Sequence, residues 1–378
     1  GGSMGKWLSA FWGRFRHRAD HLSLTLALGL SALSVLCIYA IYVAGYCKDR
    51  PWQIQALATG LGFCAVVVMV GLFDYESLAG LWRFYYPLTA VVMIYTAFFG
   101  ETRPGSDNRS WLDLGVTSIQ PSEVWKLAFI LTFAWHLAKV REDLNHPRVL
   151  IPVLLNAGVG VGVVLLQKDT GVALVLAAIV VAMLFVAGLS RKLILGAMGV
   201  GVVSVPVVWF RLLSDFQKER ILSLFDPQQF VETTAMQQLE GLDSLGSGQV
   251  FGIGLFAENH NYVPEMYNDF IFTFIGESFG FVGCVAVVAA LSIICGRMLW
   301  TGAVSRSYVG KYICTGIFAM LAFQIIVNIG MCLMVLPVIG ITLPFLSYGG
   351  TSVLSAYLSL GLVMLVHGSN KKTMFEAN

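Results

Sequence analysis

The chain is built largely from apolar runs of about 20 residues, the length that an α-helix needs to cross a bilayer. These runs constrain the fold most, because only helices and closed barrels satisfy their backbone hydrogen bonds inside lipid. Of the 378 residues, 57% are hydrophobic and 12% are charged, unlike an ordinary soluble domain. We predict an all-α polytopic membrane protein with about ten transmembrane helices, at residues 22–45, 53–73, 82–99, 122–138, 149–167, 170–189, 192–213, 270–296, 310–335 and 345–366.

The distribution of Lys and Arg predicts how these helices are oriented. With a cytoplasmic amino terminus, the short inner loops carry most of the basic residues, as the positive-inside rule requires. The two long loops, 101–120 and 214–268, then lie outside with half of the acids. Both termini are therefore expected in the cytoplasm. The net charge of +2 gives no reason to expect a nucleic-acid partner, and none is predicted.

The chain divides into six predicted segments. Residues 1–3 precede Met4 and resemble a cloning remnant, whereas 4–21 alternates aromatic and basic residues like an amphipathic helix at the cytoplasmic membrane interface. Helices one to seven occupy 22–213, and helices eight to ten occupy 269–367. Between them, 214–268 forms a large extracytoplasmic loop, and 368–378 forms a cytoplasmic tail. A loop of this length is usually functional, although its glycines also suit a flexible linker.

Asp269 is the first candidate for chemistry. It stands where a polar loop turns into an aromatic, apolar run, in NYVPEMYNDFIFTFIGES. A carboxylate at this boundary is poorly solvated, which suits a proton acceptor or a cation ligand. The alternative is that Asp269 caps the helix that follows, since Asp is a favoured N-cap residue.

A second group of charged residues, Arg109, Glu123 and Lys126, lies around the start of the fourth predicted helix. Glu123 and Lys126 are three residues apart, so they share one helix face. A simple intrahelical ion pair explains this spacing, but charges at the outer end of a span also mark functional sites.

Two further polar segments lie on the predicted outer side. Lys168 and Asp169 interrupt two apolar runs, either as a tight turn or as part of a site. Arg220 lies on the long loop, where a guanidinium can bind phosphate oxygens or simply face water.

Near the carboxyl end, prolines and glycines break the helical pattern in NIGMCLMVLPVIGITLPFLSYGGTS, which also brings Ser347 to the membrane edge. Irregular backbone at membrane depth is tolerated where it is buried in protein or lines a cavity. We therefore expect this segment to form a cavity wall.

Four motifs between Arg109 and Gly350 resemble the SEDS family (shape, elongation, division and sporulation), which includes the RodA and FtsW proteins. They are RSWLDLG, QPSE..K, PE...DFIF...GE and NIGM....LP..G..LP..SYGG, in that order. NIGM resembles the RodA branch. The resemblance implies a ten-helix enzyme of the bacterial cytoplasmic membrane that polymerises lipid II, an undecaprenyl-diphosphate-linked disaccharide pentapeptide, into glycan strands. It also implies a partner, a class B penicillin-binding protein that crosslinks those strands.

By its position in these motifs, Asp269 corresponds to the essential aspartate of the family. Glu123 and Lys126 match the polar pair after Gln-Pro-Ser, and Arg220 matches an arginine of the outer loop. The chain departs from the family pattern at four positions, with Lys168 in place of a proline, Gln249 in place of a glycine, Asn268 in place of Thr or Ser, and Ser278 in place of a second glutamate.

Glycosyl transfer from a diphosphate-linked sugar needs a base for the acceptor hydroxyl and positive charge for the departing diphosphate. The hypothesis assigns the first role to Asp269, acting directly or while holding a divalent cation such as Mg or Mn. Lys126, Arg109 and Arg220 would neutralise the diphosphate. One inverting displacement converts the alpha-linked donor into a beta-linked glycan.

The candidate substrate-binding residues are Arg109, Glu123, Lys126, Lys168, Asp169, Arg220, Glu277 and Ser347. Glu277 belongs to this set because it follows Asp269 by about two helical turns. Two alternative functions remain at this stage: a flippase or transporter of lipid-linked precursors, and an inactive scaffold for cell-wall synthases. Transporters place polar groups near the membrane midplane, often in repeated halves, whereas the charges here gather on the outer side.

Overall fold

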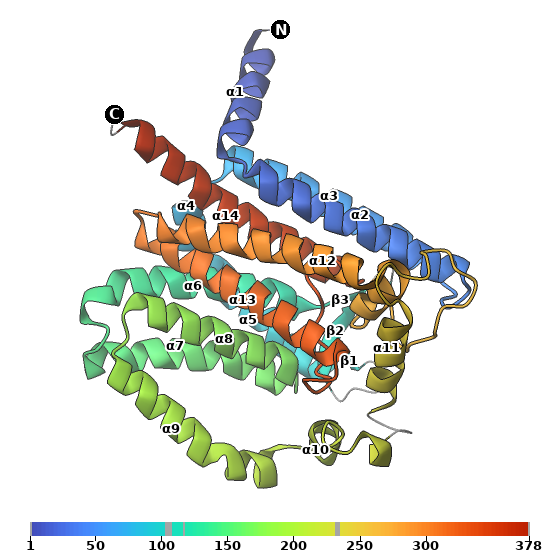
Figure 1. The fold of residues 1–378 in the computed structure, drawn as a ribbon. Helices are drawn as coiled ribbons and strands as arrows, with labels where there is room; N and C mark the ends of the chain where they lie inside the picture. The colour runs from blue at the N-terminus through green and yellow to red at the C-terminus, as the bar shows by residue number, and fades with distance from the viewer. Residues whose placement is uncertain (1, 103–107, 116–117, 231–234, 377–378) are drawn as a thin grey trace.

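The structure is a computed structural model that describes residues 2–102, 108–115, 118–230 and 235–376. Residue 1 of the predicted remnant, 231–234 of the predicted loop and 377–378 of the predicted tail lie outside the described residues. The elements, drawn in Figure 1, are α1 (Gly2–Arg18), α2 (His21–Val43), α3 (Pro51–Leu72), α4 (Tyr75–Gly80), α5 (Trp82–Phe99), β1 (Glu101–Thr102), β2 (Arg109–Asp113), β3 (Ser118–Ile119), α6 (Pro121–Val140), η1 (Arg141–Asp143), α7 (Pro147–Leu166), α8 (Thr170–Ala187), α9 (Arg191–Val207), η2 (Val208–Leu212), α10 (Asp215–Leu222), η3 (Pro227–Phe230), α11 (Met236–Ser247), α12 (Ile271–Ala303), α13 (Tyr308–Cys332) and α14 (Gly350–Glu376).

The predicted all-α polytopic fold is confirmed. Within the part of the chain that the structure describes, eight helices are long and apolar enough to cross a membrane, namely α2, α3, α7, α8, α9 with η2, α12, α13 and α14. The other two predicted spans correspond to α5 and α6, which have 18 and 20 residues and carry charged side chains. The count of ten spans therefore remains a prediction.

Small residues allow the helices to pack closely around α13. This helix contacts α12, α8 and α6, while α14 packs along α3. A Cβ atom added to Gly316 of α13 would come within 2.9 Å of Ile130 on α6, and one added to Gly62 of α3 would come within 2.8 Å of Tyr357 on α14. Backbones that approach this closely gain the van der Waals contact that holds helices together in lipid.

α9 lies apart from the other spans. None of its residues is buried, and Figure 1 shows it at the edge of the bundle. A helix that is apolar on every side and unburied needs lipid around it.

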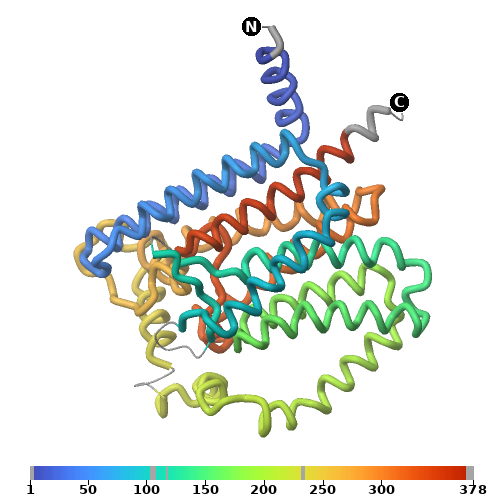
Figure 2. The backbone as a smooth tube through the Cα atoms, turned by 180° about the vertical axis from the view of Figure 1, so that it is seen from behind, coloured from blue at the N-terminus to red at the C-terminus, as the bar shows by residue number. Residues whose placement is uncertain are grey.

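The two ends of the bundle differ. α1 and the C-terminal part of α14 lie at one end, seen from both sides in Figures 1 and 2, where Lys371 Nζ donates to the His17 carbonyl (3.3 Å). α10, α11 and the β-strands lie at the other end (Figure 1). The predicted placement of both termini on one side fits this arrangement; which side is cytoplasmic stays a prediction.

The predicted outer loops contain secondary structure that the sequence did not indicate. β1, β2 and β3 form a small antiparallel sheet. In the 214–268 loop, α10 begins with a capping box between Ser214 and Gln217. The buried Gln238 of α11 donates through Nε2 to the carbonyls of Met331 (2.9 Å) and Leu336 (2.8 Å), which fixes α11 to the end of α13.

α12 is broken at Gly280, where φ is 68°. A Cβ at this position would lie 2.4 Å from the Val250 carbonyl carbon, so no other residue fits without movement. The loop supplies the hydrogen-bond partners of the broken turn: Phe281 N donates to Gln249 O (2.8 Å) and Ile253 N donates to Glu277 O (2.9 Å). Irregular backbone is stable here because the loop backbone pairs with it.

Candidate active site

Asp269 immediately precedes α12 and is half-buried at the end of the bundle opposite the termini. The N-cap of α12 is Phe270, so the interpretation of Asp269 as the cap is wrong. Asn328 of α13 donates through Nδ2 to the carbonyls of Asp269 (2.8 Å) and Ile341 (2.7 Å). This buried amide therefore holds the backbone of Asp269 against the irregular segment after α13.

The Asp269 carboxylate faces Gly340, which has a φ of 76°. A Cβ at Gly340 would lie 3.6 Å from Asp269 Oδ2. Glycine suits this position for two reasons. It adopts the left-handed backbone without strain, and it leaves the space beside the carboxylate open.

Arg220 of α10 lies on the same side of this segment. Its Nη1 donates to the Val338 carbonyl (3.0 Å), and its guanidinium lies 4.4 Å from the centre of the Phe216 ring. Burial lowers the pKa of Arg220, whereas the negative charge of Asp269 raises it. The charges of the two side chains therefore act on each other, although 49 positions separate them in the sequence, and their joint role in a site stays a prediction.

A second charged cluster forms where α6 and α8 begin. Lys126 Nζ and Glu123 Oε1 are 2.9 Å apart, and both side chains are buried. The expected intrahelical ion pair is therefore present, but it is not solvated. Asp169 caps α8 by accepting from Val172 N (3.0 Å), and Gln120 Nε2 approaches its other oxygen at 3.5 Å.

The charges of Lys126 and Glu123 both act on the Asp169 carboxylate. Burial raises the pKa of Asp169, the positive charge of Lys126 lowers it and the negative charge of Glu123 raises it. Two acids share one lysine, so the cluster favours an additional proton or an additional cationic group.

The segment between α13 and α14 separates the two clusters. A Cβ at Gly171, in the first turn of α8, would lie 3.1 Å from the Ile339 carbonyl, while Gly340 faces Asp269. Thr342 Oγ1 and Ser352 Oγ are 2.9 Å apart, and Thr351 Oγ1 accepts from Gln120 N (3.3 Å). Irregular backbone thus forms a wall with Asp169 on one side and Asp269 on the other.

Arg109 and Lys168 are exposed beside the Asp169 cluster. Arg109 N donates to the Gln167 carbonyl (3.0 Å), so β2 adjoins the turn between α7 and α8. The Arg109 side chain reaches the Phe98 carbonyl (3.3 Å). Lys168 has a positive φ of 58°, which the tight turn imposes. Both cations therefore stand at the rim of the cluster.

Glu277 and Ser347 have local partners instead. Glu277 is completely buried and accepts hydrogen bonds from Ser247, His260 and Asn261. Ser347 is buried, and its Oγ accepts from Leu343 N (2.7 Å). These contacts favour roles in holding the loop 248–268 and the segment after α13, respectively.

A hollow of about 400 Å³ is lined in part by residues of the segment 262–267, which ends two positions before Asp269, and the sequence did not indicate it. Four tyrosines from three separate segments line it. The rings of Tyr46 and Tyr262 have centres 5.7 Å apart, and those of Tyr267 and Tyr348 have centres 5.6 Å apart. Lys48, Asp49 and Glu265 add charged groups to its walls. Tyr267 and Tyr348 lie within quoted motifs, but no sequence pattern links them to the other two.

The donor set around Asp269 does not form a complete metal site. Among the described residues, no three His, Cys, Asp or Glu side chains gather as metal ligands. The neighbouring carbonyls of Val338 and Ile341 already accept from Arg220 and Asn328. Asp269 could supply one carboxylate to a Mg or Mn ion that is held mainly by substrate phosphates, the usual manner for Mg.

Comparison with known proteins identifies the family. Residues 20–372 match the sequence model of the FtsW/RodA/SpoVE family, described as cell cycle protein. The peptidoglycan glycosyltransferase MrdB of Escherichia coli strain K12 is 30% identical, over 93% of this chain and 95% of the relative. Stage V sporulation protein E of Bacillus subtilis strain 168 is also 30% identical, over 92% and 96%.

Solved structures agree with these relatives. A chain of a peptidoglycan synthase complex, solved to explain how polymerisation and crosslinking are coordinated, has a TM-score of 0.78 at 27% identity and covers 92% of this chain and 97% of its own. The rod shape determining protein RodA of Thermus thermophilus has a TM-score of 0.64 at 26% identity, covering 91% and 95%. The chain therefore belongs to the FtsW/RodA/SpoVE family.

Proposed function

We propose that this protein is a peptidoglycan glycosyltransferase that polymerises lipid II during bacterial cell-wall synthesis. Relatives that match almost the whole chain carry this activity in their names. The observation that carries the proposal is that Asp269 and Arg220 both lie against the segment after α13, Asp269 at Gly340 and Arg220 at Val338, where their charges act on each other. An acid beside a cation provides the two functions that transfer from a diphosphate-linked sugar requires.

In the proposed reaction, Asp269 accepts the proton of the acceptor hydroxyl. The hydroxyl oxygen attacks the anomeric carbon of the donor, the bond from this carbon to the diphosphate breaks, and undecaprenyl diphosphate leaves with the electron pair. A single displacement inverts the anomeric centre. Arg220 is the better-placed cation for the diphosphate, since it is only partly buried and interacts with Asp269.

The second cluster has a supporting role in this proposal. Lys126 is buried together with Glu123. Its positive charge therefore acts on Asp169 electrostatically and holds that carboxylate in position. Arg109 and Lys168, exposed at the rim, would contact the phosphates or the pentapeptide of an incoming substrate.

The tyrosine-lined hollow suits a sugar strand. Pyranose rings present apolar C–H faces that pack on aromatic rings, and their hydroxyls bond to carboxylate and ammonium groups. We assign the hollow to the growing strand as it leaves Asp269. A class B penicillin-binding protein would take up the strand there, on the outer side of the cytoplasmic membrane; the similar chain from a peptidoglycan synthase complex, in which polymerisation and crosslinking are coordinated, supports a crosslinking partner.

The test is polymerisation of purified lipid II by the purified protein, followed on a gel. Asp269→Asn should reduce polymer formation by at least 100-fold, the usual contribution of a general base. Asp243→Asn, which changes an exposed carboxylate on α11, is the matched control and should polymerise like the wild type. Full activity of Asp269→Asn would overturn the proposed base.

A chelator arm separates the two roles of Asp269. If it acts as the base alone, wild-type activity should survive chelation. Activity that disappears with chelator and returns with Mg or Mn would assign Asp269 to metal binding instead. Transport of lipid II across vesicle membranes without polymer formation would favour the flippase alternative over the enzyme.

A further inference from the structure

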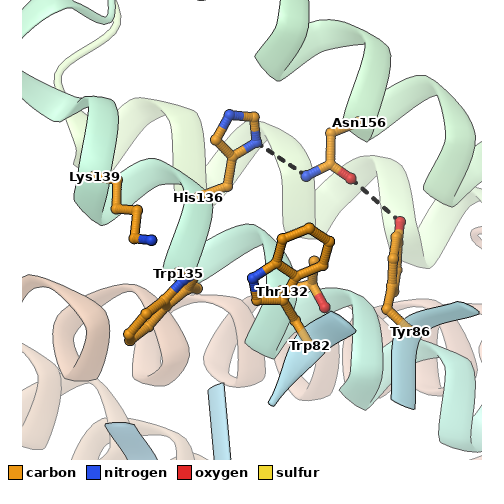
Figure 3. A pocket seen from close by; sticks show the side chains of 7 residues that line it. All are labelled: Trp82, Tyr86, Thr132, Trp135, His136, Lys139 and Asn156. Carbon is orange, nitrogen blue, oxygen red and sulfur yellow. Dashed lines mark hydrogen bonds between the residues drawn. The ribbon is translucent and has the colours of Figure 1, made fainter. Parts of the chain in front are cut away.

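A second pocket lies at the end of α6 that is far from Glu123 and Lys126. It has a volume of about 300 Å³, at the lower end of the range for ligand sites. Figure 3 shows its walls, which come from three neighbouring spans. Trp82 and Tyr86 belong to α5, Thr132, Trp135, His136 and Lys139 belong to α6, and Asn156 belongs to α7.

Trp82, Trp135 and Lys139 line the outer side of the pocket, here called its mouth, and a second cation, Arg83, does not line the pocket but follows Trp82 and is exposed beside it. Lys139 Nζ lies 4.8 Å from the centre of the Trp135 ring, and the Arg83 guanidinium lies 5.7 Å from the centre of the Trp82 ring. The Lys139 ammonium points into the space between the two tryptophans (Figure 3). No acid lines the pocket, and neither cation forms an ion pair with another described residue. The mouth therefore carries uncompensated positive charge.

The inner part of the pocket is polar, although three spans surround it. Asn156 Nδ2 donates to His136 Nδ1 (3.1 Å), and Tyr86 OH donates to Asn156 Oδ1 (3.3 Å), as the dashed lines in Figure 3 mark. Because Nδ1 accepts, the neutral imidazole carries its proton on Nε2, which has no acceptor among the described residues. The buried Thr132 hydroxyl also makes no hydrogen bond of ordinary length and angle.

A ligand for this pocket must carry a negative charge at one end, to match Lys139 and Arg83. Next to that charge it must carry acceptor oxygens, to match the donors of Thr132 and His136. Polar groups within a membrane bundle are costly, and they usually mark a binding site or a pathway. A phospholipid meets both needs, since its phosphate matches the cations and its ester oxygens match the donors beneath. Tryptophan at the level of the head groups and basic pockets between spans are features of sites for acidic lipids.

We propose that this pocket binds an anionic phospholipid, with the phosphate between Lys139 and Arg83 and the ester oxygens facing Thr132 and His136. The pocket and Asp269 lie at opposite ends of the bundle, because α6 begins beside Asp169 and ends just after Lys139. A polyprenyl diphosphate released at Asp269 would therefore not enter this pocket directly. The proposal is independent of the proposed polymerase function.

Native mass spectrometry of the purified full-length protein tests the proposal, with phosphatidylglycerol and phosphatidylcholine offered at equal concentration. The wild type should retain phosphatidylglycerol in preference. Each cation contributes about 5-fold to acidic-lipid affinity at a membrane surface, so the double variant Arg83→Gln, Lys139→Gln should bind phosphatidylglycerol about 30-fold more weakly. Lys192→Gln, an exposed cation at the start of α9, is the matched control and should bind like the wild type.

A second variant separates charge from shape. Thr132→Phe should fill the pocket and abolish lipid retention while both cations remain. Equal retention of phosphatidylcholine, or unchanged phosphatidylglycerol binding by the double variant and by Thr132→Phe, would overturn the proposal. Preferential binding of undecaprenyl phosphate over phosphatidylglycerol, lost in the same variants, would also overturn it, since the pocket would then take the lipid carrier.

Discussion

The role of Glu277 can be decided by replacing its side chain. Its Oε1 accepts from Ser247 Oγ (3.1 Å), Asn261 N (2.9 Å) and Asn261 Nδ2 (2.8 Å), and its Oε2 lies 2.9 Å from His260 Nδ1. His260 Nε2 donates to the Leu255 carbonyl (3.1 Å). If Glu277 is ionised, both ring nitrogens must donate, so the imidazole is positively charged and the contact is a buried ion pair.

Glu277→Ala should lower the free energy of unfolding by about 3 to 5 kcal/mol, because it leaves the donors of Ser247, His260 and Asn261 without their acceptor. Glu277→Gln should lower it by only about 1 to 2 kcal/mol. The glutamine oxygen can still accept from Ser247 and Asn261, while its amide can donate to a neutral His260. Against a total stability of about 5 to 15 kcal/mol, only the alanine change is a large fraction.

Unfolding of the purified protein in detergent, by heat or by added SDS, measures both changes, and limited proteolysis reports whether the loop 248–268 loosens. Glu258→Ala, which removes an exposed carboxylate from the same loop, is the control. If Glu277→Ala unfolds like the wild type and only its KM for lipid II rises, Glu277 binds substrate and the structural assignment is wrong.

Two further predictions concern other parts of the site. Burial raises the pKa of Asp169 above its unfolded value, so its stabilising contribution is complete below the unfolded pKa and is lost as pH rises through the folded one. Asp169→Asn, which keeps a good N-cap, should therefore gain thermal stability relative to the wild type as pH rises from about 4 to 8; parallel curves would contradict this. Tyr262→Ala should shorten the glycan polymers seen on a gel with little change in the initial rate, whereas Tyr262→Phe should leave their length unchanged. Equal polymer lengths from the wild type and both variants would show that the strand does not pass through the hollow.

The sequence predicts the spans well, because lipid imposes one length and one polarity on them. The run at 82–99 coincides with α5, and 170–189 differs from α8 only where Gly188 ends the helix in the left-handed conformation. The end of α12 was predicted too early, since Arg297 suggested a loop. In the structure Arg297 remains helical, and its Nε donates to Asp20 Oδ2 (2.6 Å).

The sequence pointed to individual residues of the candidate site better than to the contacts between them. The family motifs pointed to Asp269 and Arg220, and the structure places both against the segment after α13; their catalytic roles stay predictions. The sequence did not indicate the partners of Glu277, because Ser247, His260 and Asn261 lie outside its own helix, where helical periodicity gives no information. The tyrosine hollow and the pocket near Lys139 combine residues from three segments each, and such contacts depend on packing that a single sequence does not reveal.

The break at Gly280 has a consequence for the depth of Asp269 in the membrane. α12 has 33 residues, or about 50 Å at 1.5 Å per residue, whereas the hydrocarbon core is about 30 Å thick. Roughly 20 Å of the helix must lie outside the hydrocarbon. With Arg297 near a membrane surface through its ion pair with Asp20, a core of about 30 Å takes up about 20 residues and ends close to Glu277, one turn before the break at Gly280, so the excess divides about equally between the two ends of α12. Asp269 would then stand among the lipid head groups, at the level where the diphosphate of a lipid-linked sugar meets water.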